Sequence, residues 1–439
     1  MKLRYYLSCS LLLSACTQAD GGNEFGEYEA VFQSLSPEEL PAAPEDISNA
    51  YADDSAAAAL GQKFFDTRFS GPLLESDNNG LSGTVGNAGE TGKLACASCH
   101  VPEDSFVDTR STRYQVSLGA GWTTRRAPSL LDVGQAKLLM WDGRHDAAYN
   151  QVFAPIEKAM ELNSSRLFVA QQIQRYYLGE YESVFGPFPD ISAFAALDAS
   201  EAGCTEMPHQ TDSPELVDRN ASCEKPYDDN VTRVAVNFGK ALSAYLRQLS
   251  CGQSRFDNWV HGDSSALNDG EKRGALLFVG KAGCVSCHSG PFFSDQRFYN
   301  VGLPSATVAN FMQVGNDPGA SEGLAAMLED PLNVRGIFSD GDDGRLDAYE
   351  SIDFESLLGA FRTPGLRCVA QRPTYSHTGQ LRSLEDVVAF FSKGGASGGF
   401  LGTDVLSPLD LTDAEETDLV AFLKTLDGPG PDPALLTAP

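Results

Sequence analysis

The chain has 439 residues, 42% of them hydrophobic and 21% charged, so it is long enough for two or three globular domains. This composition disfavours a wholly disordered chain, a repeat solenoid or a coiled coil. With 60 acidic against 32 basic residues the formal net charge is −28, and a field of that sign repels nucleic-acid phosphates, so we expect no nucleic-acid partner. The same field either attracts a basic protein or serves solubility alone.

A short apolar stretch at residues 5–15 follows Lys2 and Arg4. It is shorter than the roughly 20 residues that span a bilayer, and with its basic start it predicts that residues 1–15 are an export signal. The stretch ends in Leu-Ser-Ala-Cys, which resembles a bacterial lipobox. Cys16 would then carry lipid and tether the protein to a bacterial membrane on the periplasmic side. An ordinary cleaved signal with an incidental cysteine is the alternative.

Two Cys-x-x-Cys-His motifs are the strongest chemical signal in the sequence. Two thiols three positions apart can add to both vinyl groups of one porphyrin, while the adjacent histidine ligates its iron. A redox dithiol or a zinc half-site would explain one copy, but two copies without a neighbouring Cys or His group predict two covalently bound c-type haems. The motif residues are Cys96, Cys99 and His100 in the first copy and Cys284, Cys287 and His288 in the second.

The motifs also indicate an internal duplication, because a similar helical segment precedes each of them, at 61–65 and at 274–278. We therefore expect two cytochrome c-like domains. The predicted organisation is a flexible acidic tether at 16–46, an N-terminal haem domain at 47–250, a C-terminal haem domain at 251–427 and a Pro-rich tail at 428–439.

Helical periodicity recurs elsewhere, at 169–177, at 234–249 and after Thr412, where Thr412 and Glu415 fit a capping box. No sustained strand alternation occurs. The sequence therefore predicts a mainly α-helical fold in which long loops enclose two porphyrins.

Four cysteines remain for disulfides in an oxidising compartment: Cys204, Cys223, Cys251 and Cys368. Four thiols allow three connectivities. We favour Cys204 with Cys223, which would close a polar insert, and Cys251 with Cys368, although the sequence establishes neither pair.

A series of further motifs, together with the two haem motifs, resembles the bacterial di-haem cytochrome c peroxidase family, which includes the MauG-like enzymes that oxidise tryptophan in a partner protein. The resemblance runs from about residue 56 to residue 426, with inserts near 70–93, 196–230 and 305–350. The motifs are Arg-Ala-Pro-Ser at 126–129, Trp-Asp-Gly-Arg at 141–144, Phe-Tyr-Asn-Val-Gly at 298–302, Phe-Arg-Thr-Pro-Gly at 361–365, Tyr-Ser-His-Thr-Gly at 375–379 and Leu-Glu-Asp-Val-Val at 384–388.

The resemblance implies a role for each motif. His100 would be the proximal ligand of a peroxide-reacting haem and His288 a ligand of an electron-transfer haem. Trp141 would lie between the two haems and relay electrons, or simply pack against porphyrin.

Three residues match the distal pocket of that family over the first haem: Gln151, Pro155 and Glu161. Glu161 would move protons as the acid/base, Gln151 would hold peroxide or water, and Pro155 would limit access to the iron. Without the resemblance, Gln151 and Glu161 would be interpreted as ordinary surface residues.

The implied function is reduction of hydrogen peroxide to water with electrons from a small cytochrome or cupredoxin. One alternative keeps the same machinery but oxidises aromatic residues of a partner protein. A plain electron-transfer cytochrome is a third possibility.

The sequence departs from the family in its haem ligands. Many members supply a second histidine to the first iron soon after the first motif, yet no histidine occurs between His100 and His145, so we expect an open first haem. The far ligand of the second haem is a Met or Tyr in the family, and that position here is Phe391. Met312, Met327, water or nothing could replace it.

The resemblance also implies a possible calcium ion between the haems, but Arg126 stands where family members often carry an Asn that helps to hold it, which disfavours calcium here. The acidic run at 340–344 is interpreted as a solvated loop rather than a calcium loop, since its glycine comes one place early for an EF-hand. His377 is expected to hydrogen-bond near a haem edge.

Overall fold

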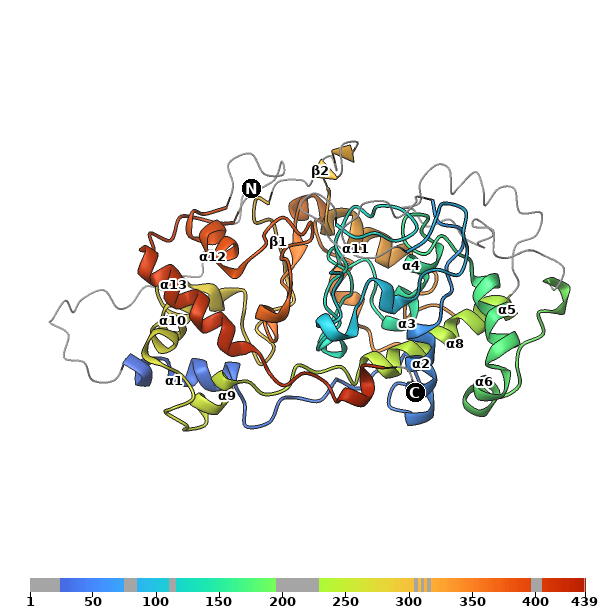
Figure 1. The fold of residues 1–439 in the computed structure, drawn as a ribbon, viewed down its shortest axis with the longest axis horizontal. Coiled ribbons are helices and arrows are strands. Elements are labelled where there is room, and N and C mark those ends of the chain that lie inside the picture. Colours follow the sequence, from blue (N-terminus) through green and yellow to red (C-terminus); the bar gives the residue numbers. More distant parts are fainter. Residues whose placement is uncertain are drawn as a thin grey trace.

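The computed structural model describes residues 24–74, 85–109, 116–194, 229–303, 307–308, 312–313, 317–395, 405–437 and 439. Within these ranges the chain is mainly helical, as predicted, and it forms two lobes that lie side by side in Figure 1. None of the helices in the described ranges combines the length and the apolar character that crossing a membrane requires.

The first lobe is built around the crossing of α2 with α8. Gly61 lies at this crossing, and a β-carbon there would come within 2.0 Å of the Ala241 carbonyl oxygen, so only glycine lets the two helices approach this closely. Phe64, Phe69 and Phe238 fill the space beside the crossing. The helices of this lobe are α2 (Ser55–Asp66), α3 (Ala148–Gln151), α4 (Phe153–Glu157), α5 (Arg166–Tyr176), α6 (Leu178–Phe185) and α8 (Asp229–Leu246).

The second lobe repeats this arrangement with α10 and α13. A β-carbon on Gly274 would lie 2.0 Å from the Asp418 carbonyl oxygen. Gly61 and Gly274 begin the two similar segments that precede the haem motifs, so the duplication expected from the sequence has a structural counterpart. The helices of this lobe are α9 (Arg255–Val260), α10 (Asp269–Val279), α12 (Leu384–Ser392) and α13 (Asp413–Leu423).

The three periodic segments predicted as helices form α5, α8 and α13. The capping box at the start of α13 is present, because Thr412 Oγ1 accepts a hydrogen bond from the Glu415 backbone and the Glu415 carboxylate accepts one from the Thr412 backbone. Strands are few. β1 (Phe298–Tyr299) pairs antiparallel with β4 (Phe361–Arg362), and β2 (Thr307–Val308) pairs with β3 (Met312–Gln313).

The prediction of a flexible tether at 16–46 is wrong for its second half. Residues Glu24–Leu35 form α1, and the side chains of Phe32 and Leu35 are fully buried in the core of the second lobe. The hydroxyl of Ser36 then donates a 2.7 Å hydrogen bond to buried Asp257. Burial of two large apolar side chains favours order over a solvated chain at this point.

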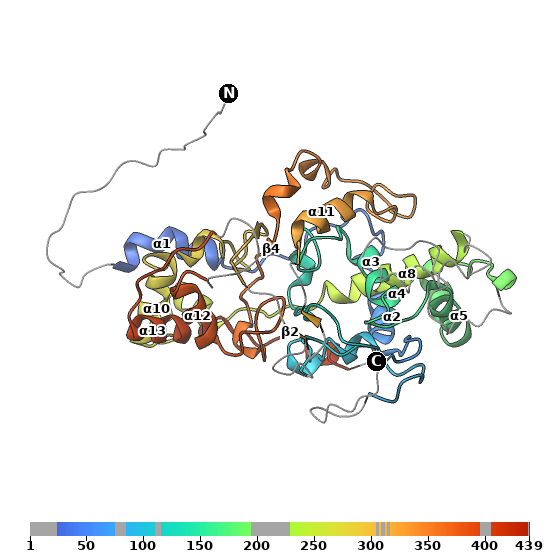
Figure 2. The same ribbon diagram turned by 90° about the horizontal axis from the view of Figure 1, so that it is seen from above.

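The predicted boundary of the C-terminal domain also needs correction. Helix α11 (Ala320–Glu329) and the segment that follows it pack on the first lobe, as Figure 2 illustrates. Leu324 and Met327 are fully buried in that core. Met327 is therefore engaged in the first lobe, which contradicts its suggested use as a ligand in the second.

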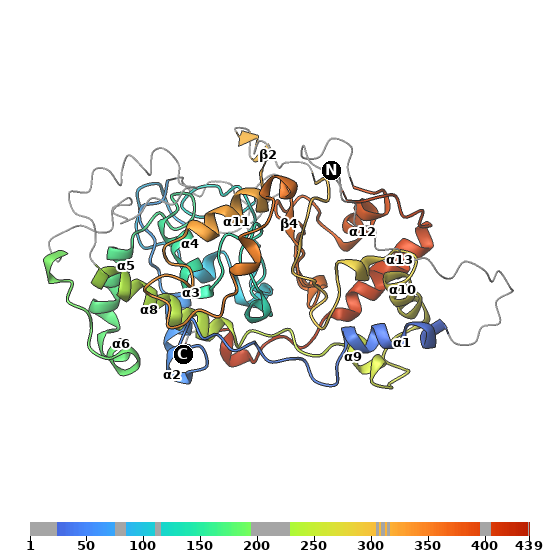
Figure 3. The same ribbon diagram turned by 180° about the vertical axis from the view of Figure 1, so that it is seen from behind.

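The Pro-rich tail returns to the first lobe, where the C-terminus lies beside α2 in Figures 1 and 3. Gln62 Nε2 donates hydrogen bonds of 2.7 Å to the carbonyl groups of Ala434 and Thr437. Tyr245 donates a third, also 2.7 Å long, to Leu435. The tail thus bridges the lobes after α13.

The predicted disulfide between Cys251 and Cys368 is confirmed, with an S–S distance of 2.03 Å. It joins the segment that connects the lobes to the loop after β4. The second predicted pair, Cys204 with Cys223, lies outside the described residues.

Candidate functional site

The first haem motif folds as a short 3-10 helix, Cys96–Ser98, that ends under its histidine. The backbone N–H of His100 donates to the Cys96 carbonyl at 2.9 Å, and the His100 ring donates through Nδ1 to the Phe106 carbonyl at 3.1 Å. A carbonyl can only accept, so Nδ1 carries the proton and Nε2 is the nitrogen left for a metal.

The second motif has the same geometry. Its 3-10 helix is Cys284–Ser286, and His288 Nδ1 donates to the Phe293 carbonyl at 2.9 Å. Phe106 and Phe293 both adopt the left-handed backbone conformation, with φ of 57° and 54°, which is strained for a bulky residue. Each turn thereby aims its carbonyl at the histidine ring.

These residues fit the covalent attachment of haem. None of the four motif cysteines, all of which are among the described residues, forms a disulfide, so each is available for a thioether bond to haem. Burial lowers the pKa of His100 and of His288, which favours the neutral imidazole that ligates iron. Each motif therefore supplies two thioether partners and one oriented nitrogen.

A second repeated structure connects the lobes. The segments 126–135 and 362–371 both begin with Arg-x-Pro and both end in a 3-10 helix, Val133–Gln135 and Val369–Gln371. The residue before each helix, Asp132 or Cys368, has a left-handed backbone.

A tight turn follows each of these segments, closed by a backbone bridge from Leu139 to His145 in one and from Tyr375 to Leu381 in the other. Trp141 and His377 occupy the same position in the two turns.

Trp141 lies at the junction of the lobes. Its indole Nε1 donates to the Arg126 carbonyl at 2.7 Å, and its own carbonyl accepts from the Arg362 backbone at 2.8 Å. The His377 ring is 6.4 Å from the Trp141 ring and stacks on Phe361 with a centroid distance of 3.6 Å. Aromatic contacts thus connect the two turns. The predicted hydrogen bond of His377 near a haem edge stays a prediction.

The residues assigned to the distal pocket lie on the segment that follows the Trp141 turn. Gln151 ends α3, and its Nε2 donates to Met140 Sδ at 3.3 Å. Pro155 is in α4, and its carbonyl accepts from Leu162 at 2.9 Å, which closes the loop that carries Glu161. A buried ion pair between Glu157, at the end of α4, and Arg166, at the start of α5, fixes these two helices to each other. The same short stretch of chain therefore presents all three predicted residues.

Glu161 is electrostatically linked to the first motif. Its carboxylate acts to raise the pKa of His100, in opposition to the larger effect of burial, so the two side chains belong to one region of the lobe. The Glu161 backbone is fixed by a 2.6 Å hydrogen bond from Ala120. Oε1 of Glu161 lies 3.3 Å from Nζ of Lys158, so the two side chains form an ion pair.

The sequence analysis did not identify Lys158 or the charged network around it. Burial lowers the pKa of Lys158, and the charges of Arg144 and Arg125 lower it further, while Glu161 opposes them. Asp142 of the Trp-Asp-Gly-Arg motif forms ion pairs with both arginines. The Trp-Asp-Gly-Arg motif is the sequence feature that could have indicated this charged network.

Arg125 carries this network to the insert before α11, because its guanidinium also pairs with Asp317. Although burial opposes it, the charges of Arg144 and Arg125 hold the pKa of Asp142 well below its usual range. The network therefore keeps an ionised carboxylate beside the Trp141 turn and anchors the insert to it.

The acidic run at 340–344 is partly paired. Asp340 contacts Lys240 at 2.7 Å and Asp343 contacts Arg345 at 2.8 Å. In the described part of the chain, no group of three or more His, Cys, Asp or Glu side chains is arranged to hold a metal ion. Within the described residues, a calcium ion of the kind that the resemblance implies therefore finds no acidic cluster to hold it.

Comparison with known proteins agrees with this geometry. A family model described as di-haem cytochrome c peroxidase matches residues 55–265. The methylamine utilization protein MauG of Methylorubrum extorquens is 30% identical over 353 residues, which cover 80% of this chain and 76% of MauG. The cytochrome-c peroxidase IdrP1 of Denitromonas iodatirespirans is 27% identical over 97% of this chain and 92% of its own length.

Solved structures share the fold. The diheme peroxidase BthA of Burkholderia thailandensis aligns with a TM-score of 0.58 and 23% identity, covering 88% of this chain and 90% of BthA. A MauG-like protein associated with microbial copper homeostasis aligns with a TM-score of 0.56 and 22% identity, covering 92% and 96%.

Proposed function

This chain belongs to the di-haem cytochrome c peroxidase family that includes MauG, and on that premise we propose that it reduces hydrogen peroxide to water. The reaction consumes two protons and two electrons for each peroxide and yields two waters. A small cytochrome or cupredoxin would supply the electrons at the second lobe. Two c-type haems, attached through Cys96 and Cys99 and through Cys284 and Cys287, would supply the redox chemistry.

Proton handling falls to Glu161 and Gln151. A carboxylate beside the peroxide site can take the proton from the inner oxygen and return it to the outer oxygen, so that the departing atom leaves as water. The Gln151 amide could donate to the developing charge, and Pro155 would limit access to a bound haem. The observation that supports this proposal is the contact of the Glu161 loop with the first motif: the Glu161 carbonyl accepts from the Ala120 backbone, and two residues earlier the Leu118 carbonyl lies 3.9 Å from Cys99 Sγ.

Electrons must pass between the lobes, and Trp141 is placed for that role. It is joined to Arg362 of the second lobe through its carbonyl and to His377 through its ring. A direct backbone hydrogen bond and an aromatic contact thus connect Trp141 to the second lobe, which supports a role in electron transfer.

The proposal is tested by replacing Glu161 with Gln and following the reaction with peroxide by stopped-flow spectroscopy. We expect the rate constant for the peroxide reaction to fall on the order of a hundredfold or more, because general acid/base catalysis contributes about that much. Glu180→Gln is the matched control, since Glu180 also pairs with a lysine, Lys63, at 3.0 Å but on the surface of the first lobe. An unchanged rate in the Glu161 variant would reject the assignment.

Oxidation of aromatic residues in a partner protein is the second candidate. It is favoured by the absence of a histidine between His100 and His145 and by Phe391, which cannot ligate iron. Phe391 lies at the same distance from the start of α12, Leu384, as Pro155 lies from the start of α3, Ala148, and it would limit access to the second haem in a similar way. Rapid turnover with a reduced cytochrome supports the peroxidase, and little turnover with efficient oxidation of a partner supports the alternative.

A non-catalytic electron-transfer cytochrome is the remaining possibility, and it would give no spectral response to peroxide. We further propose that the protein is periplasmic and anchored by lipid on Cys16. Cys16→Ala should then release it from the membrane fraction, and retention of that variant in the membrane would contradict the anchor.

A further inference from the structure

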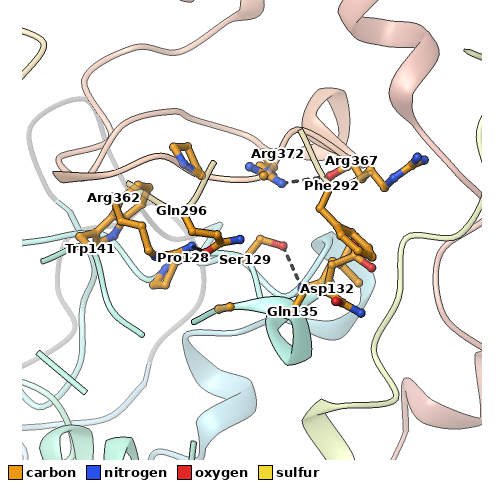
Figure 4. Close-up of a pocket in the computed structure, with 14 residues that line it drawn as sticks. Pro128, Ser129, Asp132, Gln135, Trp141, Phe292, Gln296, Arg362, Arg367 and Arg372 are labelled. Atoms are coloured by element: carbon orange, nitrogen blue, oxygen red, sulfur yellow. Dashed lines mark hydrogen bonds between the residues drawn. The ribbon is translucent and has the colours of Figure 1, made fainter. Parts of the chain in front are cut away.

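A cavity of about 70 Å³ lies between the two lobes and is lined by both Arg-x-Pro segments (Figure 4). The Pro128 backbone on one wall is close enough to His100 to affect its pKa, and the Pro364 backbone on another wall acts in the same way on His288. Trp141 forms part of the lining. The cavity therefore reaches the surroundings of both histidine ligands.

Two guanidinium groups in the lining have only neutral partners. Arg362 donates to the Met140 carbonyl at 3.4 Å and to the Gln296 amide oxygen at 3.2 Å. Arg372 donates to the Arg367 carbonyl at 3.0 Å, and its Nε is buried without a hydrogen-bond partner. Within the described ranges, no carboxylate comes within ion-pair distance of Arg362 or Arg372.

Arg367 lines the same cavity, but unlike Arg362 and Arg372 it has a carboxylate partner. Its guanidinium points away from the cavity in Figure 4 and is paired with the buried carboxylate of Asp257 at 2.8 Å. Arg367 is thus neutralised by a carboxylate of the protein itself. Arg362 and Arg372 have no such partner among the described residues, so an anion bound in the cavity could neutralise them.

The remaining nearby charges do not satisfy these two arginines. Asp132 lines the cavity, but its Oδ1 already accepts from Ser250 Oγ at 2.9 Å and from the Cys251 backbone at 3.2 Å. Asp427 accepts from the Ala370 backbone at 3.1 Å. Burial lowers the pKa of Arg362 to about 10, and repulsion from Arg372 adds to this effect.

We propose that Arg362 and Arg372 form a carboxylate-binding site and that the carboxylates they bind are propionates of the attached haems. A guanidinium matches a carboxylate in charge and in its two-donor geometry, and an anion between these cations removes their mutual repulsion. This site rests on the two haems of the proposed function but not on peroxide turnover.

The test uses the holoprotein and measures the midpoint potentials of both haems by spectroelectrochemical titration. Arg362→Gln and Arg372→Gln should each make the potential of at least one haem more negative, because a lost cation beside a propionate stabilises the oxidised, more positive iron. Arg273→Gln is the matched control, since Arg273 is 60% exposed and pairs with Asp418 on the surface. Potentials equal to those of the wild type in folded, di-haem variants would overturn the proposal.

Two further arms complete the test. If the glutamine variants do not fold, Arg372→Lys takes their place. It keeps the charge but loses the two-donor geometry, so it should still shift a potential, and an unchanged potential would again overturn the proposal.

Sodium acetate is the probe for a free carboxylate. We expect it to cause no saturable change in the wild-type potentials. A saturable change that Arg372→Lys abolishes would overturn the assignment to propionates. Shifted potentials in a protein that does not reduce peroxide would contradict the proposed function alone.

Discussion

The ammonium group of Lys158 lies 3.3 Å from the carboxylate of Glu161, and the two side chains are 24% and 22% exposed. They are separated by one turn of the chain after α4, and Ala120 fixes the backbone of Glu161 through a hydrogen bond. This ion pair and the backbone hydrogen bond together restrict the position of the Glu161 carboxylate. Lys158 is therefore a positioning residue for Glu161.

Lys158→Met should slow the peroxide reaction, because the Glu161 carboxylate then loses the ion pair that holds it in place. A partly exposed pair is worth about 0.2–1 kcal/mol, which corresponds to a rate constant lower by up to about fivefold. Lys63→Met, which removes the surface partner of Glu180, should leave the rate constant unchanged. Equal rate constants for the Lys158 variant and the wild type would contradict this role.

His377 should make stability depend on pH. Burial lowers its pKa to about 3, whereas an unfolded histidine has a pKa of about 6.5. The unfolded chain therefore binds a proton that the folded chain does not, and the free energy of unfolding falls as the pH falls from about 6.5 toward 3, by up to about 1.4 kcal/mol per pH unit. Urea unfolding of His377→Gln should show a shallower decline, with exposed His261→Gln as the control. Parallel curves would show that His377 does not titrate in this way.

The disulfide between Cys251 and Cys368 closes a loop with a sequence separation of 117 residues. In the chain-entropy account a loop of about 100 residues is worth about 4.7 kcal/mol, because the cross-link restricts the unfolded chain. The double variant Cys251→Ala and Cys368→Ala should lose about 2–5 kcal/mol of unfolding free energy in urea. Addition of a reductant should destabilise the wild type more than the variant, which no longer has this disulfide to lose. Equal stability of both proteins would rule out the stabilising role.

The first haem should rest with its far position free of protein nitrogen. The nearest histidine after the motif, His145, is 3.6 Å from Asp330 of the α11 segment and buried there. Electron paramagnetic resonance of the oxidised protein should give a high-spin signal from one haem. Two purely low-spin haems would refute this expectation.

Removal of calcium should not change the protein. Arg126 lies where the family often places a calcium-binding Asn, and here its guanidinium is held by Thr374 and by the Asp108 carbonyl. Treatment of the holoprotein with a calcium chelator should leave both midpoint potentials and the rate of peroxide reduction within error of the untreated sample. A loss that added calcium reverses would show that the ion is present.

Much of the candidate site could be predicted from sequence because its chemistry is local. The haem motifs place thiols and histidine within five residues, so the spacing alone predicts the attachment, and the capping box at Thr412 is equally local. Lys158 was missed for a different reason. A single lysine on a short helical turn has no pattern of its own, and its significance depends on where Glu161 and the Asp142 network lie.

The domain boundaries were also mispredicted, because they depend on packing between segments that are distant in the sequence. Residues 24–46 are polar and acidic enough to suggest a tether, yet Phe32 and Leu35 are buried by α10 and its neighbours. Helix α11 follows the second motif in the chain but packs against the first lobe. Sequence order does not determine which apolar surface a segment covers.

The sequence by itself determined the helical elements and the family, and it predicts two haem attachment sites and the distal residues Gln151, Pro155 and Glu161, because these depend on spacing along short stretches of chain. The tertiary structure decided which charges are neutralised. Arg367 meets Asp257 across 110 positions, while Arg362 and Arg372 meet only neutral groups at the junction of the lobes. Such pairings depend on the approach of distant segments, and in a buried region the presence or absence of a counter-charge determines what the site can bind.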